Sequence, residues 1–247
     1  MHKITIRKQA VIDLFSRQAL NYDQHAHLQT KIAARLAAAF PNLKQPDVLE
    51  IGCGTGLLTK HLLSSYAGGR FLISDLSKAM LKQCEAACGQ QPNIEYVVID
   101  GEMDGQSPPF QTRFDLIVTS MTIQWFDAPQ KSLTRLQALL KPGGHLLFTT
   151  IGPDLFPQWR AILQELELPS GLVEVPELPG LYAEEYHEMH FDNGLQFLEN
   201  LKLTGATYPR QGYDSLTPGA LRRALRLFDS KMESRADWHI LYGHLYG

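Results

Sequence analysis

An apolar run from Val48 to Ile51 ends abruptly in three alternating glycines, Gly52, Gly54 and Gly56. The run has the length of a short buried strand, and residues 57–63 resume with helical spacing, so the glycines occupy a strand-to-helix turn. Glycine permits positive φ and a close approach to the main chain, and the following helix offers unpaired N–H groups to an anion. The pattern predicts a ligand-binding turn; a glycine-rich turn without a ligand is the alternative.

The spacing of the glycines separates the known kinds of nucleotide-binding turn. A dinucleotide turn needs its third glycine one residue later, where Leu57 stands, and the Gly-Lys-Ser/Thr of a phosphate loop is absent. With Glu50 closing the strand, the pattern E-x-G-x-G-x-G resembles motif I of class I S-adenosylmethionine-dependent methyltransferases, whose glycine turn faces the methionine end of the cofactor. The resemblance implies S-adenosylmethionine as cofactor, bound by the residues of this motif: Glu50, Gly52, Cys53, Gly54, Thr55 and Gly56.

Strand and helix patterns alternate beyond the turn. Helical segments are expected to start at residues 57, 76 and 133, the last ending at 140 before a Lys-Pro-Gly-Gly turn. Strands are expected at residues 48–51, 70–75, 94–100, 114–120 and 145–150. This alternation predicts an α/β fold with a doubly wound, mainly parallel sheet. The resemblance to motif I implies that this sheet is the Rossmann-like core of a class I methyltransferase.

Two predicted strands end in carboxylates. Asp75 comes about 20 residues after the glycines, where an acid grips a ribose diol, although a helix N-cap would stand at the same place. Asp100 ends the next strand and is positioned to accept from an adenine amino group. We assign their neighbours to the same cofactor site: Leu76, Met80, Gly101, Glu102 and Ser120.

Composition restricts the class of protein. The 247 residues are 44% hydrophobic, enough for a substantial core, and the formal net charge of −3 does not favour a nucleic-acid partner. The three cysteines are too few for a disulfide framework, and buried thiols are favoured over a metal site at Cys84 and Cys88. Because no apolar run has the length of a signal peptide or membrane span, we expect a soluble, cytoplasmic protein without a metal.

Two regions are candidates for contact with the substrate. Gln124 and Trp125 follow the strand 114–120 and offer an amide and an indole wall, unless Trp125 is plain core. The Asn/Asp-Pro-Pro-Tyr/Phe motif typical of enzymes that methylate amino groups is absent there, which argues against base or glutamine N-methylation. Arg17 and Tyr22 belong to the stretch 15–23, where the first of two amphipathic helices, expected at residues 8–22 and 27–40, leads into the second. For these two residues a solvated charge and a half-buried aromatic are equally compatible with the pattern.

The C-terminal part gives a weaker signal. We expect a helix at residues 159–168, an acidic, proline-rich surface loop after it, and a helix at 193–203 with Leu195, Leu198 and Leu201 on its apolar face. A helix at 221–228 carries Arg222, Arg223 and Arg226, which are either a docking surface or a solvated face, and residues 238–246 form a closing antiparallel strand.

Several elements together resemble the malonyl-acyl-carrier-protein O-methyltransferase (BioC) family of biotin biosynthesis. They cover nearly the whole chain and comprise Phe15-Ser16-Arg17, Tyr22-Asp23, Val48 to Leu58, Asp75-Leu76-Ser77, Gln124-Trp125, Gly152-Pro153-Asp154 and Leu201 to Ala206. One departure is the interval after Asp154, which is short and proline-rich where the family has a longer helix and a sixth strand. The resemblance implies transfer of a methyl group to a malonyl carboxylate carried by acyl carrier protein or coenzyme A.

A malonyl carboxylate is already ionised at neutral pH, so this transfer needs alignment and exclusion of water but no general base. We expect Tyr22 to close over the methyl group, Arg17 or Gln124 to orient the carboxylate, and Trp125 with the three arginines of 222–226 to bind the substrate. The alternatives are a methyltransferase for another small acid or metabolite, and a cofactor-binding protein without catalysis. We expect a monomer with one methyltransferase domain, 1–247, made of N-terminal lid helices (1–45), a cofactor-binding core (46–152) and a substrate-side segment with a helical insertion (153–247).

Overall fold

The computed structural model describes residues 5–102, 112–172, 174–203 and 213–247. Its strands are β1 (Asp47–Ile51), β2 (Arg70–Asp75), β3 (Ile94–Val98), β4 (Phe114–Ser120), β5 (Leu140–Ile151), β6 (Leu181–His190) and β7 (Arg235–Tyr246). Its α-helices are α1 (Ile6–Gln18), α2 (His27–Ala37), α3 (Thr59–Ser65), α4 (Lys78–Cys88), α5 (Pro129–Gln137), α6 (Pro157–Glu165), α7 (Gly194–Leu203) and α8 (Pro218–Met232). Short 3₁₀ helices cover Tyr22–Gln24 and Ile123–Trp125.

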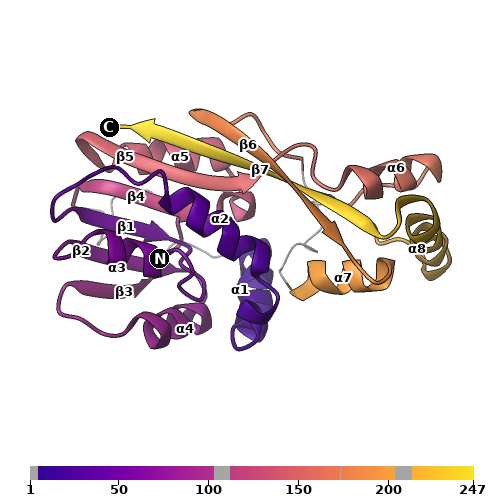
Figure 1. Cartoon of the computed structure of the whole chain (residues 1–247), viewed down its shortest axis with the longest axis horizontal. Coiled ribbons are helices and arrows are strands. Elements are labelled where there is room, and N and C mark those ends of the chain that lie inside the picture. The colour runs from indigo at the N-terminus through magenta and orange to yellow at the C-terminus, as the bar shows by residue number, and fades with distance from the viewer. Residues whose placement is uncertain (1–4, 103–111, 173, 204–212) are drawn as a thin grey trace. The chain divides into compact units, whose positions relative to one another are not determined.

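The strands form a sheet of order β3-β2-β1-β4-β5-β7-β6 (Figure 1). β1 pairs in parallel with β2 and β4, and the pairs β2–β3 and β4–β5 are parallel as well. β7 is antiparallel to β5, because Gly247 donates to the carbonyl of Gly144 at one end and Gly152 donates to that of His239 at the other. The mainly parallel, doubly wound sheet predicted from the sequence is confirmed.

The contacts divide the chain into two compact units. Unit 1 comprises residues 1–150, 177–183 and 242–247, and unit 2 comprises residues 151–176 and 184–241. Single-domain organisation remains an expectation beside this division. None of the helices in the described part of the chain has the length and hydropathy of a membrane-spanning segment.

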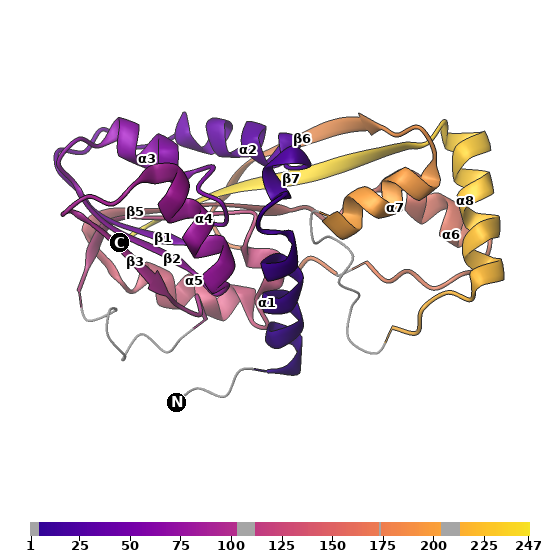
Figure 2. The ribbon, with the colours of Figure 1, turned by 90° about the horizontal axis from the view of Figure 1, so that it is seen from below.

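The central strands of unit 1, β1, β2 and β4, have side chains that are largely buried on both faces. In β1 the residues from Val48 to Ile51 are all buried, as expected for a central parallel strand. Figure 2 shows α3 and α4 on one face of the parallel strands and α5 on the other. This layering brings the carboxyl ends of β1, β2 and β4 to one edge, where ligands bind in open α/β sheets.

Unit 2 has an aromatic core. The ring of Phe156 lies edge-on to Trp238 at 4.9 Å and to Phe197 at 5.3 Å, and Phe197 stacks on Phe228 at 5.1 Å. Helix α7 buries Phe197 and Leu201, whereas Leu195, expected on its apolar face, is 58% exposed. The expectation for Leu195 was wrong. The buried face of α7 is the one that carries Phe197 and Leu201, and Leu195 lies outside it.

The boundary between α5 and β5 also differs from the sequence prediction. Helix α5 ends at Gln137, and Lys-Pro-Gly-Gly 141–144 lies within β5 instead of ending a helix at residue 140. The strand accommodates it at a register shift, and Gly144 is needed there because a Cβ atom would lie 2.9 Å from the carbonyl of Phe114. The predicted 103–112 loop lies, except for Thr112, outside the described residues, as does the expected helix end at Gly205.

The acidic stretch expected to be a loop contains strand β6. Its half-buried side chains alternate with exposed ones from Ala183 to His190, which is the period of a strand with one covered face. The interval after Asp154 therefore holds a sixth strand, and the departure expected there is corrected. The glutamates concealed the alternation because β6 is an edge strand, where charged side chains are tolerated on both faces.

Candidate active site

The three glycines at the end of β1 adopt the left-handed conformation predicted for a tight turn. Their φ angles are 71°, 55° and 93° for Gly52, Gly54 and Gly56. A Cβ atom on Gly52 would lie 2.3 Å from Oγ1 of Thr122, whereas one on Gly54 would meet nothing within 4 Å. The turn is thus closely packed at its first glycine and faces open space at its second, where a ligand can approach the main chain.

Gly56 is required for a different reason. A Cβ atom there would lie 3.0 Å from the sulfur of Cys88 and 3.1 Å from that of Cys84. Cys84 is buried, as predicted, whereas Cys88, expected to be buried as well, is half-buried. Cys53 is buried too, and all three are free thiols. Burial raises the pKa of Cys53 to about 11, so its thiol is protonated. Among the described residues, no group of His, Cys, Asp and Glu is arranged to hold a metal ion.

Asp75 lies between the glycine turn and helix α4. Its Oδ2 accepts from the backbone N–H of Gly54 at 2.9 Å and its Oδ1 from that of Ser77 at 2.7 Å. Burial raises the pKa of Asp75 to about 6, against the opposing effect of these hydrogen bonds. Ser77 is the N-cap of α4, because its Oγ accepts from the N–H of Met80. The carboxylate is therefore fixed at the turn and has lone pairs left for a ligand.

Two further residues of the motif, Glu50 and Thr55, are fixed by side-chain hydrogen bonds. The Glu50 side chain is 1% exposed and accepts from the hydroxyl of Thr59 at 2.7 Å. Burial raises the pKa of Glu50 to about 8. Thr55 donates to Asp23 at 2.5 Å, which ties the N-terminal segment to the turn. Leu76 is half-buried beside Asp75, and Met80 is fully buried.

A buried ionic cluster surrounds Asp100. Nζ of Lys8, in the first turn of α1, lies 2.5 Å from Oδ2 of Asp100 and 2.9 Å from Oε2 of Glu102. The Glu102 carboxylate also accepts from the N–H groups of Asp127 and Ala128, each at 2.8 Å, at the start of α5. The side chain of Glu102, predicted to bind cofactor, is thus engaged within the protein.

Gly101 lies between Asp100 and Glu102 in close packing. A Cβ atom there would lie 2.5 Å from Cγ2 of Ile51 and 2.9 Å from the ring of Phe126. Ser120, at the end of β4, is half-buried, and its hydroxyl lies 3.2 Å from that of Thr149.

Three aromatic side chains gather between α1 and the end of β4. Phe15 lies edge-on to Trp125 at 5.3 Å, and its ring is 6.2 Å from that of Tyr22. Tyr22 and Trp125 are half-buried, so Trp125 is not plain core. Burial and the nearby charges of Asp23 and Asp75 raise the pKa of Tyr22, which keeps its phenol protonated.

Gln124 and Arg17 differ in how firmly they are held. The Gln124 amide donates to the carbonyl of Met121 at 2.7 Å and accepts from Thr150 at 3.2 Å, so one amide hydrogen remains for a ligand. Arg17 is exposed in the last turn of α1. Arg222, Arg223 and Arg226 lie in unit 2, exposed along α8.

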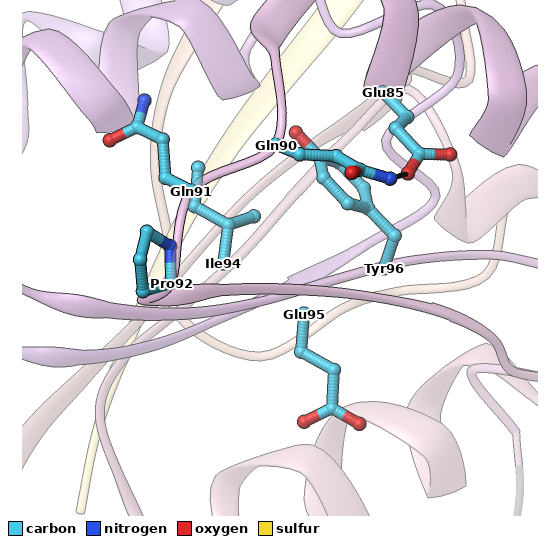
Figure 3. Close-up of a pocket in the computed structure, with 7 residues that line it drawn as sticks. All are labelled: Glu85, Gln90, Gln91, Pro92, Ile94, Glu95 and Tyr96. Atoms are coloured by element: carbon cyan, nitrogen blue, oxygen red, sulfur yellow. Dashed lines mark hydrogen bonds between the residues drawn. The ribbon is translucent and has the colours of Figure 1, made fainter.

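Lys8, Asp23 and Thr122 also belong to this site. The sequence predicted no role for Lys8 and Thr122, and Asp23 entered only as part of the family resemblance. Lys8 and Phe15 are seven residues apart and so share a helix face, which is the only signal that could have pointed to Lys8. A separate open pocket of about 490 Å³ lies between the end of α4 and β3 (Figure 3). None of the site residues predicted from the sequence lines it; its lining is Glu85, Gln90, Gln91, Pro92, Ile94, Glu95 and Tyr96.

The fold of the chain is shared with solved methyltransferase structures. A putative methyltransferase from Bacillus halodurans covers 87% of this chain, and 98% of its own, with a TM-score of 0.57 at 14% identity. The N-methyltransferase NodS from Bradyrhizobium japonicum, solved with S-adenosyl-L-homocysteine, aligns over 96% of this chain and 98% of its own, with a TM-score of 0.53 at 14% identity. At this identity the likeness establishes the fold alone.

Sequence comparison gives the family. Residues 49–146 match the model of a methyltransferase domain. Malonyl-[acyl-carrier protein] O-methyltransferases of Magnetococcus marinus and Halalkalibacterium halodurans are each 33% identical, over 92% and 82% of this chain and 88% and 84% of their own. The biotin biosynthesis bifunctional protein BioCD of Bordetella avium is 36% identical over 87% of this chain, which spans only 48% of that protein. The chain belongs to the malonyl-[acyl-carrier protein] O-methyltransferase family.

Proposed function

We propose that this methyltransferase esterifies the free carboxylate of a malonyl group carried by acyl carrier protein, with S-adenosylmethionine as the methyl donor. The observation that carries the proposal is the placement of Asp75, held between the N–H groups of Gly54 and Ser77 beside an open glycine turn. The two backbone donors leave lone pairs on both oxygens of Asp75, as a ribose diol requires. Membership of the family supplies the substrate class.

The residues present fit the cofactor at three points. Gly54 leaves open space above the main chain, Asp75 offers a fixed carboxylate, and Asp100 offers a second one at the neighbouring strand. Glu50, Cys53 and Thr55 shape the turn, and Leu76, Met80, Gly101 and Ser120 form the rest of the expected binding region. When bound, S-adenosylmethionine supplies a methyl group on a sulfonium centre that is already electrophilic.

The chain's own residues need only bind, orient and exclude water. The malonyl carboxylate is ionised at neutral pH, so no residue has to remove a proton. Phe15, Tyr22 and Trp125 form an apolar wall that desolvates the carboxylate, which makes it a better nucleophile. Because its phenol is protonated, Tyr22 acts as a hydrogen-bond donor, and Arg17 or the free amide hydrogen of Gln124 orients the carboxylate.

The carrier is proposed to dock on the arginines of α8. Arg222, Arg223 and Arg226 form a basic strip suited to an acidic carrier protein. A solvated helix face is the competing interpretation, and coenzyme A is the competing carrier. The expectations of a monomer and of a cytoplasmic location stay predictions.

Intact-mass spectrometry tests the reaction directly. Malonyl-loaded acyl carrier protein is incubated with the enzyme and S-adenosylmethionine, with Asp75→Ala as the matched control. A gain of one methyl group, absent in the control, is the expected outcome. Transfer only to other small acids would favour a different acceptor, and tight cofactor binding without transfer to any acid would favour a non-catalytic protein.

A further inference from the structure

Lys8 is a buried cation whose surroundings point to a role in the cofactor site. Its side chain is only 10% exposed, and those of its partners Asp100 and Glu102 are 14% and 7% exposed. Burial acts to lower the pKa of Lys8, but the two carboxylates outweigh it and raise the pKa, so the ammonium group stays charged. A charge-assisted hydrogen bond of this kind fixes the orientation of its acceptor.

Both oxygens of Asp100 are held, and by different groups. Oδ2 accepts from Lys8 at 2.5 Å, and Oδ1 accepts from the backbone N–H of Glu102 at 3.0 Å. Glu102 is itself fixed by Ser132 at 3.1 Å and by the N–H groups of Asp127 and Ala128, which directly precede α5. The plane of the Asp100 carboxylate is therefore set by Lys8 on one side and by a rigid backbone on the other, with a lone pair left on each oxygen.

We propose that Lys8 is a positioning residue that aims the free lone pairs of Asp100 at the amino group of the cofactor's adenine. The inference rests on the proposed function and on the expected contact between Asp100 and adenine. A carboxylate held in one orientation accepts from an amino group and repels a carbonyl at the same position of the ring. Lys8 thereby sharpens the preference of the enzyme for adenine over its 6-oxo analogue.

A purely structural role predicts something different. Lys8 also ties α1 to the sheet through Asp100 and Glu102. If that is its only role, its loss loosens α1 and lowers the affinity for every ligand by the same factor. Arg7 provides the matched control, because it ties the same helix through Asp127 at 2.6 Å and the carbonyl of Phe126 at 3.1 Å without touching Asp100. The ratio of two affinities separates the roles, since loosening of α1 cancels in the ratio.

Isothermal titration measures the dissociation constants of S-adenosylhomocysteine and S-inosylhomocysteine for wild type, Lys8→Met and Arg7→Met. We expect wild type to prefer the adenosyl ligand by roughly 30-fold, because the 6-oxo analogue leaves a hydrogen bond unmade and places a carbonyl oxygen against the carboxylate of Asp100. Lys8→Met is expected to reduce this preference about fivefold or more, and Arg7→Met to leave it unchanged. An unaltered ratio in Lys8→Met, or an equal fall in both variants, overturns the proposal.

Two further results keep the outcome interpretable. If Lys8→Met does not fold, Lys8→Arg replaces it, because this variant keeps the charge but exchanges a compact ammonium for a planar guanidinium. We expect Lys8→Arg to lower the ratio of the two affinities and Arg7→Lys to leave it unchanged. An unchanged ratio in Lys8→Arg is then the result that overturns the proposal. If wild type binds neither ligand, the proposed cofactor is wrong and the role of Lys8 falls with it. If the ratio is unaltered while S-adenosylhomocysteine binds normally, the positioning role of Lys8 is refuted and the proposed function is not affected.

Discussion

The carboxylates of this site carry out different tasks because their surroundings differ. Asp75 accepts two backbone hydrogen bonds at the rim of the turn, whereas Glu50 is buried beneath it with the hydroxyl of Thr59. Burial raises the pKa of both, to about 6 and about 8, and the smaller rise at Asp75 reflects its extra donors. Near neutral pH, Asp75 is therefore ionised and Glu50 is largely protonated.

Cofactor affinity should fall at acid pH because of Asp75. A ribose diol donates to the ionised carboxylate, so the dissociation constant of S-adenosylhomocysteine is expected to rise about tenfold per pH unit below pH 6. Titration between pH 5 and 8 measures it. Asp75→Asn should bind more weakly at every pH and lose the dependence, and a wild-type affinity that stays constant down to pH 5 would contradict the assignment.

Glu50 should make the ligand-free protein less stable as pH rises. The pKa of Glu50 in the folded state, about 8, exceeds the ordinary value of 4.5, so between these pH values the folded state binds one proton more than the unfolded state. The free energy of unfolding therefore falls as the pH rises from 4.5 to 8. Glu50→Gln keeps an acceptor for Thr59 and has no charge to bury. From pH 5 to pH 8 the free energy of unfolding of Glu50→Gln should rise relative to that of wild type by about 3 kcal/mol, measured by urea denaturation. A constant difference would count against the raised pKa.

At the scale of elements, the glycine turn needs glycine for two different reasons within three residues: close packing at one position and space for a ligand at the other. Gly52 is confined by Thr122, and Gly54 faces open space, although both have positive φ. The same substitution at the two positions should therefore affect different properties.

Gly52→Ala should destabilise the protein, and Gly54→Ala should mainly block the ligand. We expect a loss of about 3 kcal/mol or more for Gly52→Ala, from backbone strain and the overlap with Thr122, and about 1 kcal/mol for Gly54→Ala from strain alone. Thermal unfolding and titration with S-adenosylhomocysteine measure the two effects. Equal stability losses, or normal binding by Gly54→Ala, would contradict this division.

The hydrogen bonds that Glu102 accepts at the N-terminal end of α5 give a second test at this scale. Glu102 accepts from two backbone N–H groups and from Ser132, so Glu102→Ala leaves buried donors unpaired. We expect a loss of about 2–4 kcal/mol in the free energy of unfolding, because hydrogen bonds to a buried charge are costly to remove. Urea denaturation measures it, and Ser132→Ala, which removes one donor and leaves the two N–H groups and Lys8 in place, should cost less. A loss below 1 kcal/mol for Glu102→Ala would refute the capping role.

The elements that the sequence predicts best are those whose local pattern agrees with their burial. β1, β2 and β4 were anticipated within a residue because their apolar runs are buried on both faces. β6 was missed because an edge strand tolerates glutamates. Residues 141–144 were assigned to a helix end although they lie within β5, where Gly144 packs against the carbonyl of Phe114 on β4. Lys8 and Asp23 lie far along the chain from Asp100 and Thr55, and no local pattern encodes such contacts.

At the scale of the whole molecule, a net charge of −3 coexists with a basic strip on α8. Attraction between exposed charges is screened by salt, so docking of an acidic carrier should weaken as ionic strength rises. The strip lies in unit 2, whereas the glycine turn and Asp75 lie in unit 1. Carrier recognition and cofactor binding should therefore be separable by mutation.

Reversing the strip should affect only the carrier-bound substrate. For the triple variant R222E/R223E/R226E we expect KM for malonyl-loaded acyl carrier protein to rise about tenfold or more at low salt, and its salt dependence to vanish. Affinity for S-adenosylhomocysteine and activity on malonyl coenzyme A serve as controls and should not change. Unchanged activity on the carrier-bound substrate would refute docking at α8.

The closing strand has a consequence for how the protein is made. Residues 242–247 belong to unit 1, where Tyr242 is fully buried and Gly243 lies so close to the ring of Phe148 that a Cβ atom would stand 2.0 Å from it. They follow residues 184–241 of unit 2 in sequence. On the ribosome, the first-made part of the sheet must wait until all of unit 2 has been synthesised before β7 can complete it. The nascent chain thus exposes the unpaired edge of β5 (Leu140–Ile151) from the time that strand is made until β7 (Arg235–Tyr246) follows it, and this is the interval in which a chaperone would be needed.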